Sequence, residues 1–184
     1  MRYEMIGMAV FLAAAVFGLA DLVPADGAPA ISVYSIPGTA LRPKDFDNAA
    51  RRWSSTSSDF SFDTTYGESC HAVAPIQLPQ GAVIKSITAV LTDNGSGMEE
   101  DVMVYVFRSG LERSSFATMA TFSTTGLPSS STRRSLTKTA VSFPKIDNGK
   151  YVYSLQVRFL QGRPYLKYHG VKIVYDYADR RPAG

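Results

Sequence analysis

The chain has 184 residues, of which 45% are hydrophobic and 19% are charged, and its formal net charge is +3. The Lys and Arg residues are scattered and form no dense stripe, which excludes the usual pattern of a nucleic-acid-binding protein. The small positive excess favours, at most, acidic partners such as an anionic polysaccharide.

The N-terminal segment has the parts of a secretory signal peptide. Arg2 is followed by an apolar run, Met5–Ala20, and then by small residues at Val23–Ala25 and Ala28–Ala30, the order expected of a cleavable signal. The run is shorter than the roughly 20 residues that span a bilayer, although an uncleaved anchor is the alternative. We therefore expect residues 1–30 to be a signal peptide and short leader. The protein would then be secreted or extracytoplasmic, with no stable membrane insertion after cleavage.

The remainder is expected to form one domain without a disulfide. Cys70 is the only cysteine, so the hydrophobic core must hold the fold unaided. A small buried hydrophobe is favoured for Cys70 over a reactive thiol. The domain is expected over residues 31–178, followed by a flexible tail at 179–184.

The segment Tyr151–Phe159 carries the strongest strand pattern. Apolar and aromatic residues alternate with polar ones along it, which predicts a strand with one buried face. A turn signal at Asp147–Gly149 precedes it.

The last strand changes parity near Gly170. Leu166 and Tyr168 share one face, whereas Val171 and Ile173 lie on the opposite parity. A β-bulge at Gly170 would return both pairs to one inward face.

Shorter runs of β-branched and aromatic residues predict further strands. Val102–Phe107 is apolar on both faces, which predicts a central strand covered on both sides. Thr124–Lys138 is polar and is predicted to be a loop. The other predicted strands are Ile31–Ile36, Trp53–Ser55, Asp59–Phe62, Ser69–Ile76, Ala82–Asp93, Phe116–Ser123 and Ala140–Phe143. Together they predict an all-β fold, an antiparallel, jelly-roll-like β-sandwich of about eight or nine strands, with a closed barrel as the alternative.

Five segments, in this order, resemble a recurrent type of secreted bacterial β-sandwich protein of unassigned function. They are IPGTALRPKD (Ile36–Asp45), APIQLPQGAVIKSITAVLTDN (Ala74–Asn94), MATFSTTG (Met119–Gly126), IDNGKYVYSLQV (Ile146–Val157) and GVKIVYDY (Gly170–Tyr177). The resemblance covers most of the mature chain and implies a secreted sandwich. It implies no catalytic or ligand-binding residue.

The sequence carries no recognisable catalytic motif. Neither His71 nor His169 lies in a G-x-S-x-G or H-E-x-x-H pattern, and no two carboxylates have a spacing that marks them as a glycosidase pair. We therefore expect a protein that is not an enzyme and that uses no cofactor.

One acidic loop is a candidate calcium site. It contains Asp93, Glu99, Glu100 and Asp101 around two glycines, and carboxylate oxygens on a Gly-containing loop are calcium ligands. The spacing differs from that of an EF-hand, and a solvated hairpin connection is the favoured alternative.

Four aromatic residues are candidates for stacking on a sugar, which presents a flat apolar face to an exposed ring. They are Trp53, Tyr66, Tyr165 and Tyr168. Trp53 follows Arg51 and Arg52 in a polar stretch and is the best single candidate, although a place in the core is the alternative for a lone Trp.

Three functions are compatible with this sequence. The first is a non-catalytic module that binds an extracellular polysaccharide or another cell-surface polymer. The second is a structural or adhesive subunit that self-associates in an extracellular assembly, for which long strands with unpaired edges are suited. The third is a secreted hydrolase. Only an analogy of fold favours the first of these.

Overall fold

A computed structural model describes residues 30–44, 51–64, 69–95, 101–112 and 115–177. Strands dominate them, with one short 3-10 helix, Gly38–Ala40. The strands are β1 (Ala30–Pro37), β2 (Arg42–Pro43), β3 (Arg51–Ser55), β4 (Phe60–Thr64), β5 (Cys70–Ile76), β6 (Val83–Asp93), β7 (Val102–Gly110), β8 (Phe116–Ser123), β9 (Ser130–Lys138), β10 (Tyr151–Phe159) and β11 (Leu166–Tyr177). The eleven strands exceed the predicted eight or nine.

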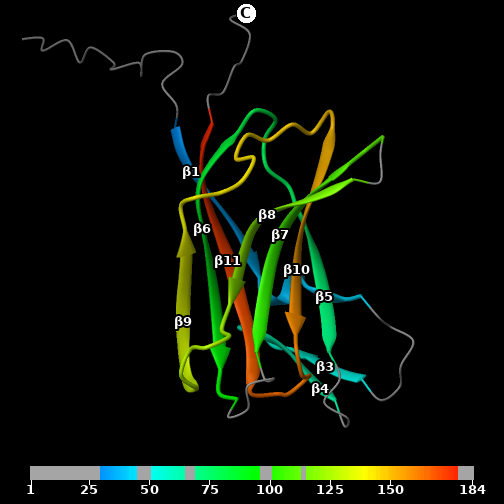
Figure 1. Cartoon of the computed structure of the whole chain (residues 1–184), viewed down its shortest axis with the longest axis vertical. Coiled ribbons are helices and arrows are strands. Elements are labelled where there is room, and N and C mark those ends of the chain that lie inside the picture. Colours follow the sequence, from blue (N-terminus) through cyan, green and yellow to red (C-terminus); the bar gives the residue numbers. More distant parts are fainter. Residues whose placement is uncertain (1–29, 45–50, 65–68, 96–100, 113–114, 178–184) are drawn as a thin grey trace, which may run out of the picture.

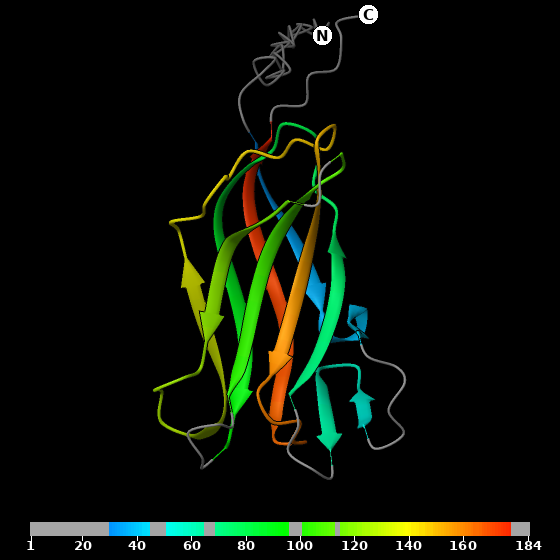
Figure 2. The ribbon, with the colours of Figure 1, turned by 45° about the vertical axis from the view of Figure 1, so that its right-hand side comes forward.

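Two antiparallel sheets face each other (Figures 1 and 2). Sheet A has the order β3-β4-β11-β6-β9, with β1 also paired to β11, and sheet B has the order β2-β5-β10-β7-β8. The predicted antiparallel β-sandwich is therefore confirmed, and the barrel alternative is excluded. The predicted signal peptide and C-terminal tail lie outside the described residues, apart from Ala30, which begins β1.

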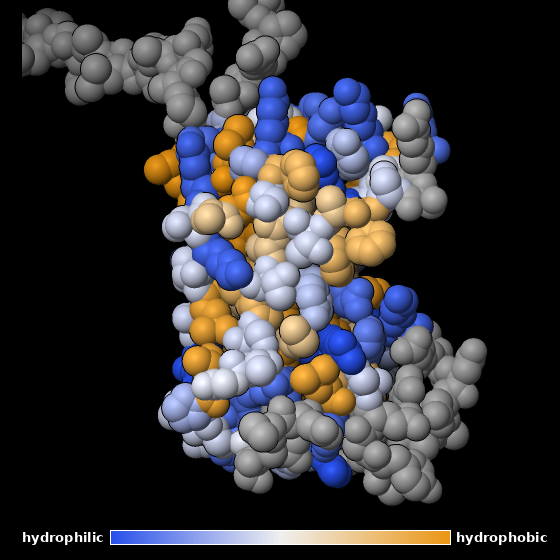
Figure 3. Space-filling view, in the orientation of Figure 1, coloured by the Kyte–Doolittle hydropathy of each residue, from blue (hydrophilic) through white to orange (hydrophobic). Residues whose placement is uncertain are grey.

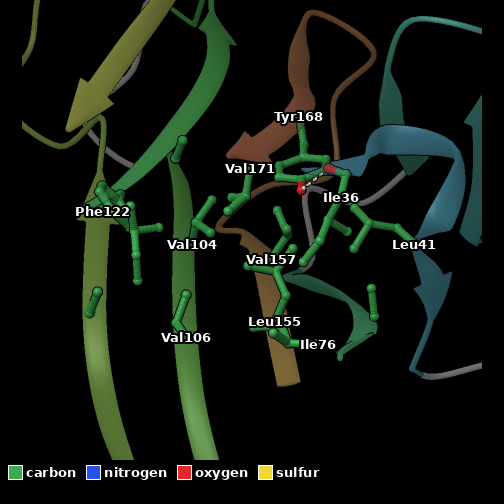
Figure 4. Packing of buried hydrophobic residues seen from close by; sticks show 14 of the residues in the cluster. Ile36, Leu41, Ile76, Val104, Val106, Phe122, Leu155, Val157, Tyr168 and Val171 are labelled. Carbon is green, nitrogen blue, oxygen red and sulfur yellow. Dashed lines mark hydrogen bonds between the residues drawn. The ribbon is translucent and has the colours of Figure 1, made fainter. Parts of the chain in front are cut away.

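The core lies between the sheets and is built from alternate residues of each strand. On β10, Leu155, Val157 and Phe159 are fully buried, as their alternation predicts. Residues from both sheets meet them in the packing shown in Figure 4. Cys70 is buried in this core, as expected of a small hydrophobe.

The predicted bulge at Gly170 is confirmed. The register between β11 and β6 shifts between Tyr168 and Gly170, so that Tyr168 and Val171 both point inward. The Tyr168 hydroxyl donates a 2.9 Å hydrogen bond to the carbonyl of Ile36, drawn in Figure 4. A Cβ atom at Gly170 would lie 3.1 Å from the same Ile36 oxygen, so the glycine lets β1 approach β11 closely.

Two predictions between β8 and β10 are wrong. The segment predicted as a loop contains β9, which forms an edge of sheet A. Most of its side chains are exposed, and Leu136 is its apolar residue that packs against the core. The segment predicted as a strand, Ala140–Phe143, is irregular instead, and Phe143 has a positive φ of 54°.

The strand predicted at Val102–Phe107 is present as β7, but it is covered on only one side, not on both as predicted. Val102, Val104 and Val106 face the core. The opposite side of the strand carries Tyr105 and Phe107, which lie on the outer face of sheet B rather than under a second layer. Within the described residues, no helix has the length and apolar character needed to cross a membrane.

Candidate functional site

Sheet B presents its aromatic residues on one outer face. Successive side chains of a strand point to opposite sides of the sheet, so the valines of β7 fill the core while Tyr105 and Phe107 face outward. Phe116, at the start of β8, pairs with Ser109 and therefore shares this outer face. Figure 3 views this side of the molecule and shows apolar surface bordered by hydrophilic residues.

The three rings form a continuous row, which we call the aromatic row. The rings of Tyr105 and Phe107 are stacked, with centroids 5.5 Å apart and planes 8° from parallel. Phe107 meets Phe116 edge to face at 5.9 Å. Phe116 is 74% exposed, and exposing a phenyl group to water is costly, so this end of the row forms an apolar patch on the surface.

A hydrogen-bonded polar cluster lies beside the aromatic row on β5 and β10. The Gln156 amide nitrogen donates to Nδ1 of His71 over 2.7 Å, and Nε of Arg158 donates to the Ser69 hydroxyl over 2.9 Å. The same hydroxyl lies 3.4 Å from Nε2 of His71. These contacts orient the side chains of Gln156, Arg158 and His71 on the outer face of sheet B.

The cluster and the row meet across the strands. Tyr105 pairs with Gln156, and Gln156 pairs with Val73 on β5. Val73 in turn pairs with Arg42 on β2. Five adjacent strands spaced roughly 4.8 Å apart span about 19 Å, so this face offers an extended surface with the aromatic row beside the polar cluster.

Three of the four aromatic residues singled out from the sequence lie outside the aromatic row. Trp53, on β3, is 45% exposed and stacks on buried Phe60 at a centroid distance of 5.8 Å. Tyr165 is partly buried against the core. Tyr168 is fully buried, so it offers no ring face to a sugar. Tyr66 lies outside the described residues.

Burial dominates the environment of Tyr168 and raises the pKa of its hydroxyl well above the ordinary value. The side chain therefore stays neutral and serves as a hydrogen-bond donor within the core.

The acidic loop is described only at its two ends. Asp93 is buried and accepts a hydrogen bond from the Gly95 backbone over 3.0 Å, and Asp101 accepts one from the Thr125 hydroxyl over 2.7 Å. Glu99 and Glu100 lie outside the described residues. Among the residues that are described, no three His, Cys, Asp or Glu side chains gather to hold a metal ion. The calcium site therefore stays a prediction.

The second histidine sits in a structural contact on sheet A. Nδ1 of His169 donates to the Ser58 carbonyl over 3.0 Å, and Nε2 lies 2.8 Å from the Thr92 hydroxyl. Burial is the main reason that the pKa of His169 is lowered. Thr92 is only 6% exposed, so its hydroxyl is poorly accessible to a substrate.

Sequence reasoning missed the aromatic row. The run on β7 is apolar at every position from Val102 to Phe107, and such a run does not reveal which face is covered. One signal was present in the sequence: the aliphatic residues and the aromatic residues of this run fall on opposite parities.

Comparisons with known proteins identify the architecture. No family model matches the chain, and no curated protein matches it either. Among solved structures, it is similar to the xylan-binding module CBM15, with a TM-score of 0.51 and 13% identity, over 79% of this chain and 97% of that one.

Two further solved structures are more distant. The C-terminal CBM6 of LamC, a marine laminarinase from Zobellia galactanivorans, has a TM-score of 0.44 and 10% identity, over 77% of this chain and 98% of that one. The module TmCBM27, described for specific mannan recognition, has a TM-score of 0.39 and 8% identity, over 81% and 98% of the two chains. The chain thus has the β-sandwich fold seen in the xylan-binding module CBM15.

Proposed function

We propose that this protein is a non-catalytic module that binds a polysaccharide along the outer face of sheet B. The observation that carries the proposal is the aromatic row of Tyr105, Phe107 and Phe116 beside the polar cluster of Gln156, Arg158 and His71. Sugar rings present apolar C–H faces and a rim of hydroxyls, so they need both kinds of surface side by side.

Each part of the face has a distinct role in this proposal. Phe116 is the most exposed ring and provides the first apolar contact. Arg158 donates to sugar oxygens, and the Gln156 carbonyl oxygen accepts from a sugar hydroxyl. Because Ser69 and Gln156 already orient Arg158 and His71, little side-chain entropy is lost on binding.

The fold likeness supports this proposal at the level of architecture. The module CBM15 is named for binding xylan, which makes xylan the first polysaccharide to test. The proposal also includes export of the protein, because the predicted signal peptide would place it where polysaccharides occur. N-terminal sequencing of the secreted product tests that part, and recovery of an intact Met1 on a membrane-bound product would contradict it.

Affinity electrophoresis in gels that contain xylan, mannan or laminarin tests the binding proposal. We expect at least one polysaccharide to retard the protein and the variant Phe116→Ala to lose about tenfold or more in affinity, as buried aromatic anchors do. Because Phe116 is mostly exposed, this variant should melt at the same temperature as the natural protein.

The matched control is Val174→Ala, which removes apolar surface from the outer side of sheet A, where Val174 pairs with Val33. It should bind as the natural protein does. Equal losses in both variants, or retardation by no polysaccharide, would contradict the proposed function.

A second candidate function rests on a different surface. Ile31 and Val33 on β1 are 75% and 58% exposed, and they project from the same side of this strand. They favour the adhesive or structural subunit, in which copies associate through this strand. Light scattering after size-exclusion chromatography tests it: a monomer that is unchanged by Val33→Ser would contradict association through β1.

A further inference from the structure

A cavity of about 370 Å³ opens at the end of the sandwich where β7 ends and β10 begins, at the top of Figure 1. This volume lies in the range of roughly 300–1,000 Å³ that is typical of small-molecule pockets. Its lining includes three cations, Arg108, Lys145 and Lys150, and one carboxylate, Asp147. The excess of positive charge attracts an anion.

Arg108 is held in an unusual way. Its guanidinium carbon lies 3.5 Å from the centroid of the Phe143 ring and 4.4 Å from that of Tyr151. Both rings therefore make cation–π contacts with the guanidinium. Within the described residues, its Nε is buried without a hydrogen-bond acceptor, so a ligand in the cavity would meet the terminal N–H groups of Arg108.

Phe143 reaches this position at a conformational cost. Its φ of 54° is in the left-handed region, which a bulky side chain rarely adopts. Backbone hydrogen bonds of the residues before and after it fix it there. The Ser142 N–H donates to the Met119 carbonyl, and the Pro144 carbonyl accepts from the Ile84 N–H, each over 2.9 Å. Strained residues of this kind cluster at ligand-binding sites.

The carboxylate of Asp147, the acidic group in the cavity, contacts groups other than Arg108. Oδ1 of Asp147 accepts from the Gly149 backbone over 3.2 Å and from the Gln80 amide over 3.5 Å. Its Oδ2 lies 4.0 Å from Nζ of Lys150. The carboxylate of Asp147 therefore builds the turn before β10, and the positive charges of Arg108 and Lys145 remain for a ligand.

We propose that this cavity binds the carboxylate of an acidic sugar, a uronate. A planar carboxylate matches the two parallel N–H donors at the edge of a guanidinium, and the lysines add charge at the rim. The ring of Tyr151 lines the cavity and supplies an apolar contact for a sugar ring. The identification of the acid as a sugar rests on the proposed function, whereas the binding of a carboxylate does not.

Titration of the ¹⁵N-labelled protein with glucuronate, followed through the Nε–Hε resonance of Arg108, tests the proposal. Glucuronate should move this resonance in a saturable way, and glucose should not move it. Acetate should bind at least about tenfold more weakly than glucuronate because it lacks the ring, and phosphate should also be weaker because it lacks the planar fit.

The variant K145Q/K150Q leaves Arg108 and its two rings in place, so it tests the cavity without removing packed groups. It should weaken glucuronate binding at least about tenfold. The control K138Q/K172Q makes the same change in charge at two exposed lysines on sheet A and should leave binding unchanged.

The outcomes separate this proposal from the proposed function. An Arg108 resonance that no carboxylate moves would overturn the uronate site, as would equal binding of acetate, phosphate and glucuronate. Retardation by a neutral polysaccharide reports on the aromatic row alone, and K145Q/K150Q should not change it. Loss of glucuronate binding in Phe116→Ala but not in K145Q/K150Q would also overturn the proposal, because it would move the site to the row.

Discussion

The two outer faces of the sandwich differ far more than its two inner faces. On sheet A, the outer side carries Thr88 and Thr137, joined by a 2.9 Å hydrogen bond, and an ion pair of 2.7 Å between Lys85 and Asp176. On sheet B, the same strand geometry presents the aromatic row and the polar cluster. Inside, both sheets contribute aliphatic residues and phenylalanines.

This difference separates the requirements of folding from those of the proposed binding. Burial of the inner faces supplies the main favourable term for folding, and it constrains every second residue of each strand. The outer residues are released from that constraint, so the two outer faces can carry different kinds of side chain. On sheet B, the 74% exposed Phe116 at the end of the aromatic row is not required by folding.

Neighbouring residues on β10 give the sharpest contrast between inside and outside. Leu155 is fully buried, and Gln156 lies on the outer face. Leu155→Ala should lower the free energy of unfolding by about 2–5 kcal/mol, whereas Gln156→Ala should change it by only about 0.5 kcal/mol. Urea denaturation measures both. Similar losses in the two variants would break the distinction between a folding face and a binding face.

The close approach of the β1 backbone to Gly170 shows that sheet A also needs a residue without a side chain at this position. A Cβ atom there meets the Ile36 carbonyl at 3.1 Å, so Gly170→Val should cost about 1–3 kcal/mol through displacement of β1. Lys172→Val, at an exposed position on the same strand, is the control and should be nearly neutral. An unchanged melting temperature in Gly170→Val would mean that β1 and β11 are not held as described.

Trp53 tests whether the binding face is confined to sheet B. Its indole covers Phe60 but is 45% exposed, so Trp53→Ala should lose about half of the roughly 3–5 kcal/mol of a buried Trp. Polysaccharide retardation should persist at a temperature where the variant is folded. If retardation disappears while the melting temperature stays high, the ligand site is on the β3–β4 hairpin, as the sequence alone suggested.

The smallest expected effect is the pH dependence that His169 gives to sheet A. Burial lowers its pKa most, Arg133 and Lys167 lower it further, and the Ser58 carbonyl and Asp59 oppose them. A histidine with a lowered folded pKa contributes stability that is present above its ordinary pKa and is lost as the pH falls below that value. Melting temperatures from about pH 8 to about pH 5 should therefore fall less steeply for His169→Gln than for the natural protein. Equal slopes for the two proteins would contradict this assignment.

The sequence predicts those elements whose inner face is well covered. Tyr151–Phe159 was predicted with its observed bounds because its alternation is strong, and the parity change at Gly170 marks the bulge. The strand Ser130–Lys138 was missed because an edge strand buries little of its surface and can be polar along most of its length. Phe143 lies in an irregular segment and packs on Arg108, a contact that local patterns do not reveal.

The candidate site was hidden for a related reason. Tyr105 and Phe107 lie in an apolar run, and only the tertiary structure shows that no second layer of described residues covers them. His71 and Gln156 are 85 positions apart in sequence, so their contact depends on the pairing of β5 with β10. Tyr168 was named as a stacking candidate, although the bulge that the sequence predicts at Gly170 places it in the core.

Mapping of a bound oligosaccharide by backbone amide chemical shifts tests the central claim most directly. We expect addition of the oligosaccharide prepared from the retarding polysaccharide to shift the amides of residues 103–107 and of their partners on β8 and β10. Amides of residues 86–90, on sheet A, should stay in place. Shifts confined to sheet A or to the β3–β4 hairpin would contradict the assignment of binding to the outer face of sheet B.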